Sequence, residues 1–397
     1  MNKVREGYKI TEIGDIPIEW EVRYLEDVCE ILDSYRKPIK ASDREEMKGD
    51  IPYYGASGVI DWINDFIFDE ELILLGEDGE NLNSRNTDLA FKISGKSWVN
   101  NHAHVFRIAN KNRDNIDFMV YYLESKDYSR YIAGSAQPKI TQAQCRKFLL
   151  PSPDLKEQEK IASILSTVDE QIDNVDALIE KNKELKKGLM QTLLTKGIGY
   201  TKFKTTEIGE IPEEWDVKKL ECVFEILDSM RKPIKASDRE KIEGNIPYYG
   251  ASGVIDWIND YIFDEELILL GEDGENLNSR NSDLAFKISG KTWVNNHAHV
   301  FRVINKKECN IDFMVYYLEA KDYSIYIAGS AQPKITQAQC RKFLLPLPEK
   351  QEQDKIASIL LESDKKIEEY ENKKQKLEEL KKGLMQELLT GNIRVNN

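Results

Sequence analysis

The chain is an internal duplication, and no other feature limits its possible folds as strongly. The segment that begins at Tyr8 recurs from Phe203 at a constant offset of 195 residues, without a gap, as far as Leu389. In the central part of each copy, residues 30–150 and 225–345, 106 of 121 positions are identical. Two nearly identical modules on one chain predict a target that has two matching parts.

Composition narrows the class of protein. The 397 residues suit two or three domains, and the duplication makes them two copies of one unit. Duplex DNA is the commonest ligand with two matching parts. The net charge of −14 is unusual for a DNA-binding protein, so any phosphate-binding surface must be local. The short apolar runs exclude a membrane span. Of the five cysteines only Cys145 and Cys340 are repeat mates, which favours reduced thiols in the cytoplasm over a disulfide framework.

Each repeat has three parts, which together predict an α+β fold. A short strap comes first, at residues 11–28 and 206–223. A mixed α/β module follows, with strands on both sides of a glycine-rich turn at residues 76–79, two strands around residues 94–95, and a helix that Gly134 ends. A long helix completes the repeat. The predicted domains are 1–153 (first module and strap), 154–198 (central helix), 199–348 (second module and strap) and 349–397 (C-terminal helix).

The long helices carry an apolar seam typical of a coiled coil. Apolar residues step by four and three positions from Ile161 to Ile179, and the second copy follows the same frame from Ile356. We expect the two helices to pack antiparallel, because two identical units on one chain use one contact twice around a pseudo-two-fold axis. Asn182 takes the place of an apolar residue in this seam, and we expect it to be solvated where the helices diverge.

At this point the parts resemble the specificity subunit of type I restriction-modification systems. The resemblance is most specific at the junction of module and helix, GSAQPKITQAQCRKFLLPSPDLKEQEKIASIL (residues 134–165) and its copy at residues 329–360. LLGEDGE and VNNHAHVF also look like loops of the family's target-recognition domains. The resemblance implies two such domains, separated by two helical spacers, that read a bipartite DNA site. This chain departs from the family in the near identity of its two domains, which favours a palindromic, interrupted site.

The candidate DNA contacts are polar and basic residues near glycines and aromatic residues. Asparagine suits adenine and arginine suits guanine or phosphate, although solvated loops would have a similar composition. The resemblance adds the glutamine and lysine of the GSAQPK segment. In the first module the candidates are Arg36, Lys37, Lys40, Tyr54, Ser57, Asn81, Asn83, Arg85, Asn86, Asn101, His102, Gln137 and Lys139. In the second they are Arg231, Lys232, Lys235, Tyr249, Ser252, Asn276, Asn278, Arg280, Asn281, Asn296, His297, Gln332 and Lys334.

The resemblance further implies partner subunits that dock on the helices. These are two methyltransferase subunits, which use S-adenosylmethionine, and restriction subunits that translocate DNA and hydrolyse ATP with Mg²⁺. The helix residues expected at this subunit interface are Ile161, Leu165, Ile172, Leu185, Leu189, Ile356, Leu360, Ile367, Leu380 and Leu384.

Signs of catalysis are missing from the chain itself. It has no Walker motif, no glycine-rich cofactor loop and no methyltransferase tetrapeptide, so we expect neither a catalytic residue nor a bound cofactor. Two alternatives stay open. The chain could be a coiled-coil scaffold with paired protein- or glycan-binding modules. It could also be a metal-dependent hydrolase centred on His102-Ala-His104, although this pair has no further ligand nearby in the sequence and we expect no metal.

Overall fold

The computed structural model describes residues 5–132, 138–327 and 333–395. The chain divides into two compact units, residues 1–176 with 372–397 and residues 177–371. Each unit contains one module, one end of the long helix α6 (Leu155–Lys196) and one end of the long helix α12 (Lys350–Leu388). The units therefore share both helices.

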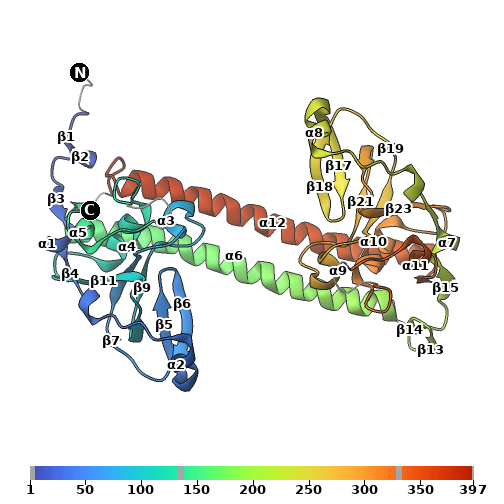
Figure 1. Ribbon diagram of the computed structural model, residues 1–397, viewed down its shortest axis with the longest axis horizontal. Helices are drawn as coiled ribbons and strands as arrows, with labels where there is room; N and C mark the ends of the chain where they lie inside the picture. Colours follow the sequence, from blue (N-terminus) through green and yellow to red (C-terminus); the bar gives the residue numbers. More distant parts are fainter. Residues whose placement is uncertain (1–4, 133–137, 328–332, 396–397) are drawn as a thin grey trace. The chain divides into compact units, whose positions relative to one another are not determined.

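The module of the first unit is built on two four-stranded sheets (Figure 1). One has the order β4-β11-β8-β9 and is antiparallel throughout, and the other has the order β6-β5-β10-β7, in which β10 runs parallel to β5. The strands are β4 (Cys29–Ile31), β5 (Lys48–Gly55), β6 (Gly58–Ile63), β7 (Phe68–Asp69), β8 (Leu72–Gly76), β9 (Ala90–Ile93), β10 (Lys96–Val99) and β11 (Ala103–Ile108). The sequence predicted two strands around residues 94–95, but β9 and β10 belong to different sheets and β11 is a third strand.

Short elements complete this unit. The strap is a hairpin of β1 (Tyr8–Thr11) and β2 (Gly14–Pro17), followed by β3 (Glu21–Tyr24), which pairs with β12 (Leu149–Ser152). The remaining helices are α1 (Leu25–Val28), the 3-10 helix η1 (Asp33–Tyr35), α2 (Ala41–Glu46), α3 (Asn81–Ser84), α4 (Ile116–Ser125) and α5 (Gln142–Arg146).

The antiparallel sheet lies between two hydrophobic cores, because side chains alternate along each strand. On β8, Ile73 and Leu75 face the core that contains α4 and the start of α6, whereas Leu72 and Leu74 face the core shared with the second sheet. This two-sided burial explains the unbroken apolar run of β8. Trp20 of the strap joins the first core, and its indole donates a hydrogen bond to Glu157 at the start of α6.

Helix α4 ends earlier than the sequence predicted. The spacing of aromatic residues extended the expected helix to Gly134, which lies outside the described residues, but α4 ends at Ser125 and the backbone of Lys126 is extended. Contacts of two side chains, one distant in the sequence and one local, favour this early end. The guanidinium of Arg85 donates to the carbonyl groups of Glu124 and Lys126, and the Tyr128 hydroxyl donates to the carbonyl of Leu123.

The second unit repeats this architecture, with sheets β16-β23-β20-β21 and β18-β17-β22-β19. Its strands are β13 (Phe203–Thr206), β14 (Gly209–Pro212), β15 (Asp216–Lys219), β16 (Phe224–Ile226), β17 (Glu243–Gly250), β18 (Gly253–Ile258), β19 (Phe263–Asp264), β20 (Leu267–Gly271), β21 (Ala285–Ile288), β22 (Lys291–Val294), β23 (Ala298–Val303) and β24 (Leu344–Leu347). Its shorter helices are α7 (Leu220–Val223), η2 (Asp228–Met230), α8 (Ala236–Arg239), η3 (Glu240–Ile242), α9 (Asn276–Ser279), α10 (Ile311–Ala320) and α11 (Gln337–Cys340).

Within each unit the two long helices run antiparallel, as predicted. In the first unit, Lys381 pairs with Asp169 at 2.6 Å and Lys374 pairs with Asp176 at 2.7 Å, so the residue number rises along one helix as it falls along the other. In the second unit, Lys186 pairs with Asp364 at 2.5 Å and Lys183 with Glu371 at 3.4 Å. Buried apolar side chains line the seam between these ion pairs, among them Val168, Val175, Ile179, Ile367 and Leu377.

Asn182 corrects one expectation about the seam. The residue is buried, with 8% of its surface exposed, rather than solvated. It donates a hydrogen bond to the carbonyl of Leu178 in the same helix, which partly satisfies the buried amide. Across the described residues, the helices are too polar or too short to cross a bilayer.

Candidate nucleic-acid interface

Several of the predicted DNA-contacting residues lie close together at one edge of the module, where β8 ends and β11 begins. Main-chain hydrogen bonds tie the segments together there: Glu77 N to His102 O and Ile140 N to Glu77 O, both at 2.8 Å, and Asn100 N to Tyr54 O at 3.0 Å. We call this region the loop edge. It comprises residues 36–40, 54–58, 77–86, 99–102 and 138–140, and residues 231–235, 249–253, 272–281, 294–297 and 333–335 in the second unit.

A glycine allows the segments of the loop edge to approach closely. A Cβ atom on Gly76 would lie 2.8 Å from the Leu89 side chain and 3.1 Å from the carbonyl oxygen of Ala56. The second contact is with main chain, which cannot move aside easily. Gly271 has the same neighbours in the second unit, Leu284 and Ala251. The glycine at this position therefore brings the turn after β5 against the end of β8.

A group of charged residues, most of them buried or half-buried, connects the loop edge to the strands below it. We call Asp33, Arg36, Glu77, His104 and Lys139 the ion-pair network. Arg36 contacts Glu77 and donates a hydrogen bond to Ala103 O at 2.7 Å. Lys139 Nζ lies 2.9 Å from Glu77 Oε1. His104 Nδ1 lies 2.6 Å from Asp33 Oδ2. The repeat mates Asp228, Arg231, Glu272, His299 and Lys334 form the same contacts.

The cations keep the two buried carboxyl groups ionised. Burial by itself would raise the pKa of Asp33, but the hydrogen bond and charge of His104 and the nearby Arg36 hold this pKa below its ordinary value. Burial likewise opposes ionisation of Glu77, and hydrogen bonds from Lys139 and Arg36 outweigh it and lower the pKa. The ionised carboxylates of Asp33 and Glu77 therefore hold the side chains of Arg36 and Lys139 in place.

Three members of the network are of residue types that can bind a metal ion. In the second unit, ligand atoms of Asp228, Glu272 and His299 lie within 4.8 Å of one another. The cationic groups of Arg231 and Lys334 already occupy the Glu272 carboxylate, at 2.5 and 2.9 Å. The second ring nitrogen of His299 is bonded to a main-chain carbonyl. The other histidine of the pair, His297, is exposed and turns instead to Asp273.

The predicted DNA-contacting residues fall into two groups by what their side chains touch. Some side chains are engaged within the fold: Arg36 as above, Asn81 with the main chain of Thr87, and Arg85 with α4 and the ring of Tyr128. Tyr54 is half-buried, and exposed His102 and Lys139 pair with Asp78 and Glu77. Their repeat mates Arg231, Asn276, Arg280, Tyr249, His297 and Lys334 behave alike.

The other group is exposed, and its side chains have no hydrogen-bond or ion-pair partner among the described residues. Its members are Lys37, Lys40, Ser57, Asn83, Asn86 and Asn101, with Lys232, Lys235, Ser252, Asn278, Asn281 and Asn296. Gln137 and Gln332 lie outside the described residues. The exposed group has free donors and acceptors at both loop edges, which is the chemistry needed to contact phosphates and base edges.

Sequence reasoning missed two members of the ion-pair network, Asp33 and Glu77, and it named His104 only as part of the histidine pair. The available signal for the burial of His104 was its place on a strand two residues before Phe106, which is buried, because residues two apart on a strand face the same side. The acids gave no local signal, since their partners are distant along the chain.

The predicted helix interface also divides by exposure. Ile161, Leu165, Ile356, Leu360 and Ile367 are buried, and Ile172, Leu189 and Leu384 are half-buried. Leu185 and Leu380, which are repeat mates, are 56% and 50% exposed. These two leucines are therefore the members of the set that a partner could contact directly.

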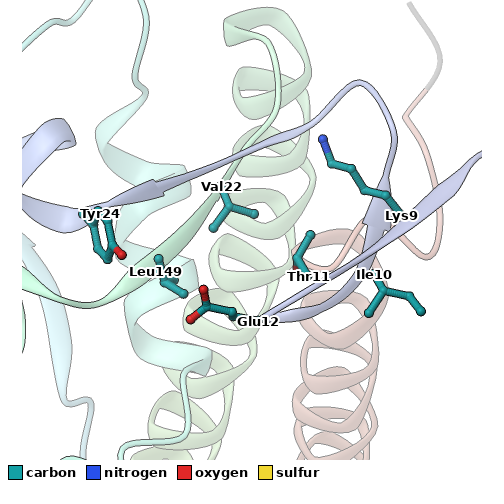
Figure 2. A pocket seen from close by; sticks show the side chains of 7 residues that line it. All are labelled: Lys9, Ile10, Thr11, Glu12, Val22, Tyr24 and Leu149. Atoms are coloured by element: carbon teal, nitrogen blue, oxygen red, sulfur yellow. The ribbon is translucent and has the colours of Figure 1, made fainter.

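A hollow on the strap of the first unit contains no comparable grouping of polar residues. It measures about 690 Å³ and is lined by residues of β1, the turn after it, β3 and β12 (Figure 2). Its one basic side chain, Lys9, donates to the carbonyl of Ile18. Ile10 and Tyr24 are exposed there.

Comparison with known proteins decides between the function classes. The family model described as the type I restriction modification DNA specificity domain matches residues 17–185 and again residues 212–379. The chain belongs to this family. The MjaVIII type I restriction enzyme specificity subunit of Methanocaldococcus jannaschii is 31% identical, over 99% of this chain and 97% of its own length.

Two solved structures share the fold. The type I restriction-modification S subunit from M. genitalium has a TM-score of 0.61 at 16% identity and covers 96% of this chain and 97% of its own. A chain from a study of complex assembly in the type I system has a TM-score of 0.55 at 15% identity, over 95% and 99% of the two chains. The chain is thus a specificity subunit, as the resemblance in its sequence implied, and these comparisons do not support the scaffold and hydrolase alternatives.

Proposed function

We propose that this specificity subunit reads one DNA sequence twice, through the exposed residues of its two loop edges. The observation that carries this proposal is that both units present the same exposed polar side chains next to the same ion-pair network. The exposed lysines contact phosphates, and the exposed asparagines and serines contact base edges.

The differences between the repeats support identical half-sites. Fifteen positions differ between residues 30–150 and 225–345, and none falls in the loop edges. The two-fold relation expected from the sequence would present the two halves on opposite strands. We infer that the target is an interrupted palindrome.

The chain itself is proposed to be non-catalytic. It recruits two methyltransferase subunits, and then restriction subunits, through the exposed side of its long helices. The cofactors of the reaction, S-adenosylmethionine, ATP and Mg²⁺, belong to those partners. A protein that acts on chromosomal DNA in this way works in the cytoplasm.

Replacing the exposed lysines with glutamine tests this proposal. The variant carries Lys37→Gln, Lys40→Gln, Lys232→Gln and Lys235→Gln and is assembled with the methyltransferase subunit. We expect weaker binding to every duplex, whatever its sequence. The slope of log Kobs against log salt concentration should become shallower by about 0.9 for each lysine that contacts a phosphate. A salt titration of DNA binding measures both quantities.

A matched control removes other exposed lysines. Lys111→Gln with Lys306→Gln eliminates two repeat-mate lysines that pair with Glu71 and Glu266 outside the loop edges. This control should leave affinity and salt slope unchanged. Equal slopes for the fourfold variant and the unchanged protein would exclude these lysines from the DNA interface.

A further inference from the structure

His104 lies at the centre of the ion-pair network and is fully buried. Its Nδ1 lies 2.6 Å from the carboxylate of Asp33, and its Nε2 lies 2.9 Å from the main-chain carbonyl oxygen of Ile140. His299 has the same two distances, 2.6 and 2.9 Å, to Asp228 and Ile335. The arrangement therefore occurs once in each unit.

Both partners of the ring can only accept a hydrogen bond. A main-chain carbonyl has no proton to donate, and an ionised carboxylate has none either. Groups other than the ring also favour an ionised Asp33 carboxylate: the Val105 N–H donates to it at 2.9 Å, and the guanidinium of Arg36 lies 3.4 Å away. Both ring nitrogens of His104 must then carry a proton, which makes the ring an imidazolium cation.

The carboxylates next to the ring favour this cation. Asp33 on η1 contacts the ring directly, and Glu77 of the loop edge lies 3.9 Å from Nδ1. Arg36 and Lys139 share Glu77 with it. On α5, burial raises the pKa of the Cys145 thiol, so this group stays neutral. Arg36 and Lys139 already balance the two carboxylates in charge, so the reason for the imidazolium is geometric. Removing either ring proton from His104 would leave a nitrogen lone pair against the Asp33 carboxylate or the Ile140 oxygen.

The bond to Ile140 fixes a segment of the loop edge to the core. Residues 138–140 also bond to their neighbours within the loop edge, through Gly79 N to Pro138 O and Ile140 N to Glu77 O. The His104 bond connects this group of loops to β11. Lys139, a predicted DNA-contacting residue, lies between Pro138 and Ile140.

We propose that His104 and His299, as imidazolium cations, are positioning residues that hold residues 138–140 and 333–335 in the conformation that recognises DNA. This inference rests on the proposed function. It assigns to the buried histidines a role in specificity that requires no contact with DNA.

Nitrogen-15 NMR of labelled histidine tests the protonated state directly. The chain has four histidines. At neutral pH, His104 and His299 should give signals in which both ring nitrogens are protonated, and these signals should disappear in His104→Gln with His299→Gln. Neutral tautomers for both residues would overturn the proposal.

DNA binding and amide hydrogen exchange test the positioning role. In the His104→Gln and His299→Gln variant, assembled with the methyltransferase subunit, the preference for specific over random duplex should fall at least about tenfold, the value of one hydrogen bond to a charged group. The amides of Gly79 and Ile140 should exchange faster. If this variant does not fold, Asp33→Asn with Asp228→Asn keeps the rings, removes their charged acceptors and should give the same losses.

The outcomes separate the two proposals. A folded variant with unchanged discrimination and unchanged exchange would overturn the role of the histidines, while the proposed function would stand. Absence of sequence-specific binding by the unchanged protein, assembled in the same way, would overturn the proposed function, and this inference with it. Lys111→Gln with Lys306→Gln serves as the control and should change neither measurement.

Discussion

Leu185→Glu with Leu380→Glu is expected to abolish assembly of the specificity subunit with its methyltransferase subunits, while both units stay folded. The two leucines are 56% and 50% exposed on α6 and α12, so charged substitutions there leave the internal packing intact. A glutamate buried in an apolar subunit interface without a partner is strongly unfavourable. We expect affinity for the methyltransferase subunit to fall at least about tenfold for each substitution.

The measurement is co-purification or analytical ultracentrifugation of the mixed subunits, with circular dichroism to verify folding. Lys187→Glu with Lys382→Glu is the matched control. It introduces glutamate on the same two helices at exposed repeat-mate positions. Each lysine lies two residues after the corresponding leucine and therefore roughly on the opposite side of its helix. The control should assemble normally. Normal assembly of the leucine variant would show that these leucines are not the docking surface.

Arg36→Ala is expected to destabilise the first unit by about 3–5 kcal/mol, because it removes the one guanidinium that contacts both buried carboxylates, Asp33 and Glu77. Arg36 has a side chain only 12% exposed and contacts Glu77, which is 9% exposed. An arginine that served only to bind phosphate would contribute little to stability in the absence of DNA. The experiment therefore distinguishes a role within the fold from the DNA contact that the sequence predicted.

Urea unfolding followed separately for the two units measures this effect. The second unit keeps Arg231 and its network, so its transition is an internal reference. The neighbouring substitution Lys37→Ala is the matched control, since that lysine is exposed and has no partner among the described residues; its effect should stay within about 0.5 kcal/mol. Equal stability of the Arg36 and Lys37 variants would contradict the structural role of Arg36.

Sequence patterns predicted the features that depend on regular spacing. The four-and-three repeat from Ile161 to Ile179 predicted a helix and the face that it buries. The duplication predicted two equal modules, and the symmetry of identical contacts predicted the antiparallel pairing observed within each unit. Each of these inferences follows from positions close together in the chain or from the exact repeat.

The same patterns could not assign roles to individual charged residues. Arg36 and Arg85 look like DNA contacts in the sequence, but their guanidinium groups are used within the fold, by Glu77 and by the end of α4. Asn182 looks solvated, yet it is buried. The partners of these arginines are about 40 residues away in the sequence and are brought to them by tertiary packing. Periodicity contains no information about such distant pairs.

The measurement that tests the proposed function most directly is sequencing of methylated adenines in DNA from cells that make this chain with its methyltransferase subunit. Cells that lack only this chain are the control. We predict one interrupted palindrome, with the same half-site in inverted orientation on the two strands and one methylated adenine in each half. Two unrelated half-sites, or methylation that does not depend on this chain, would contradict the proposal that both loop edges read the same sequence.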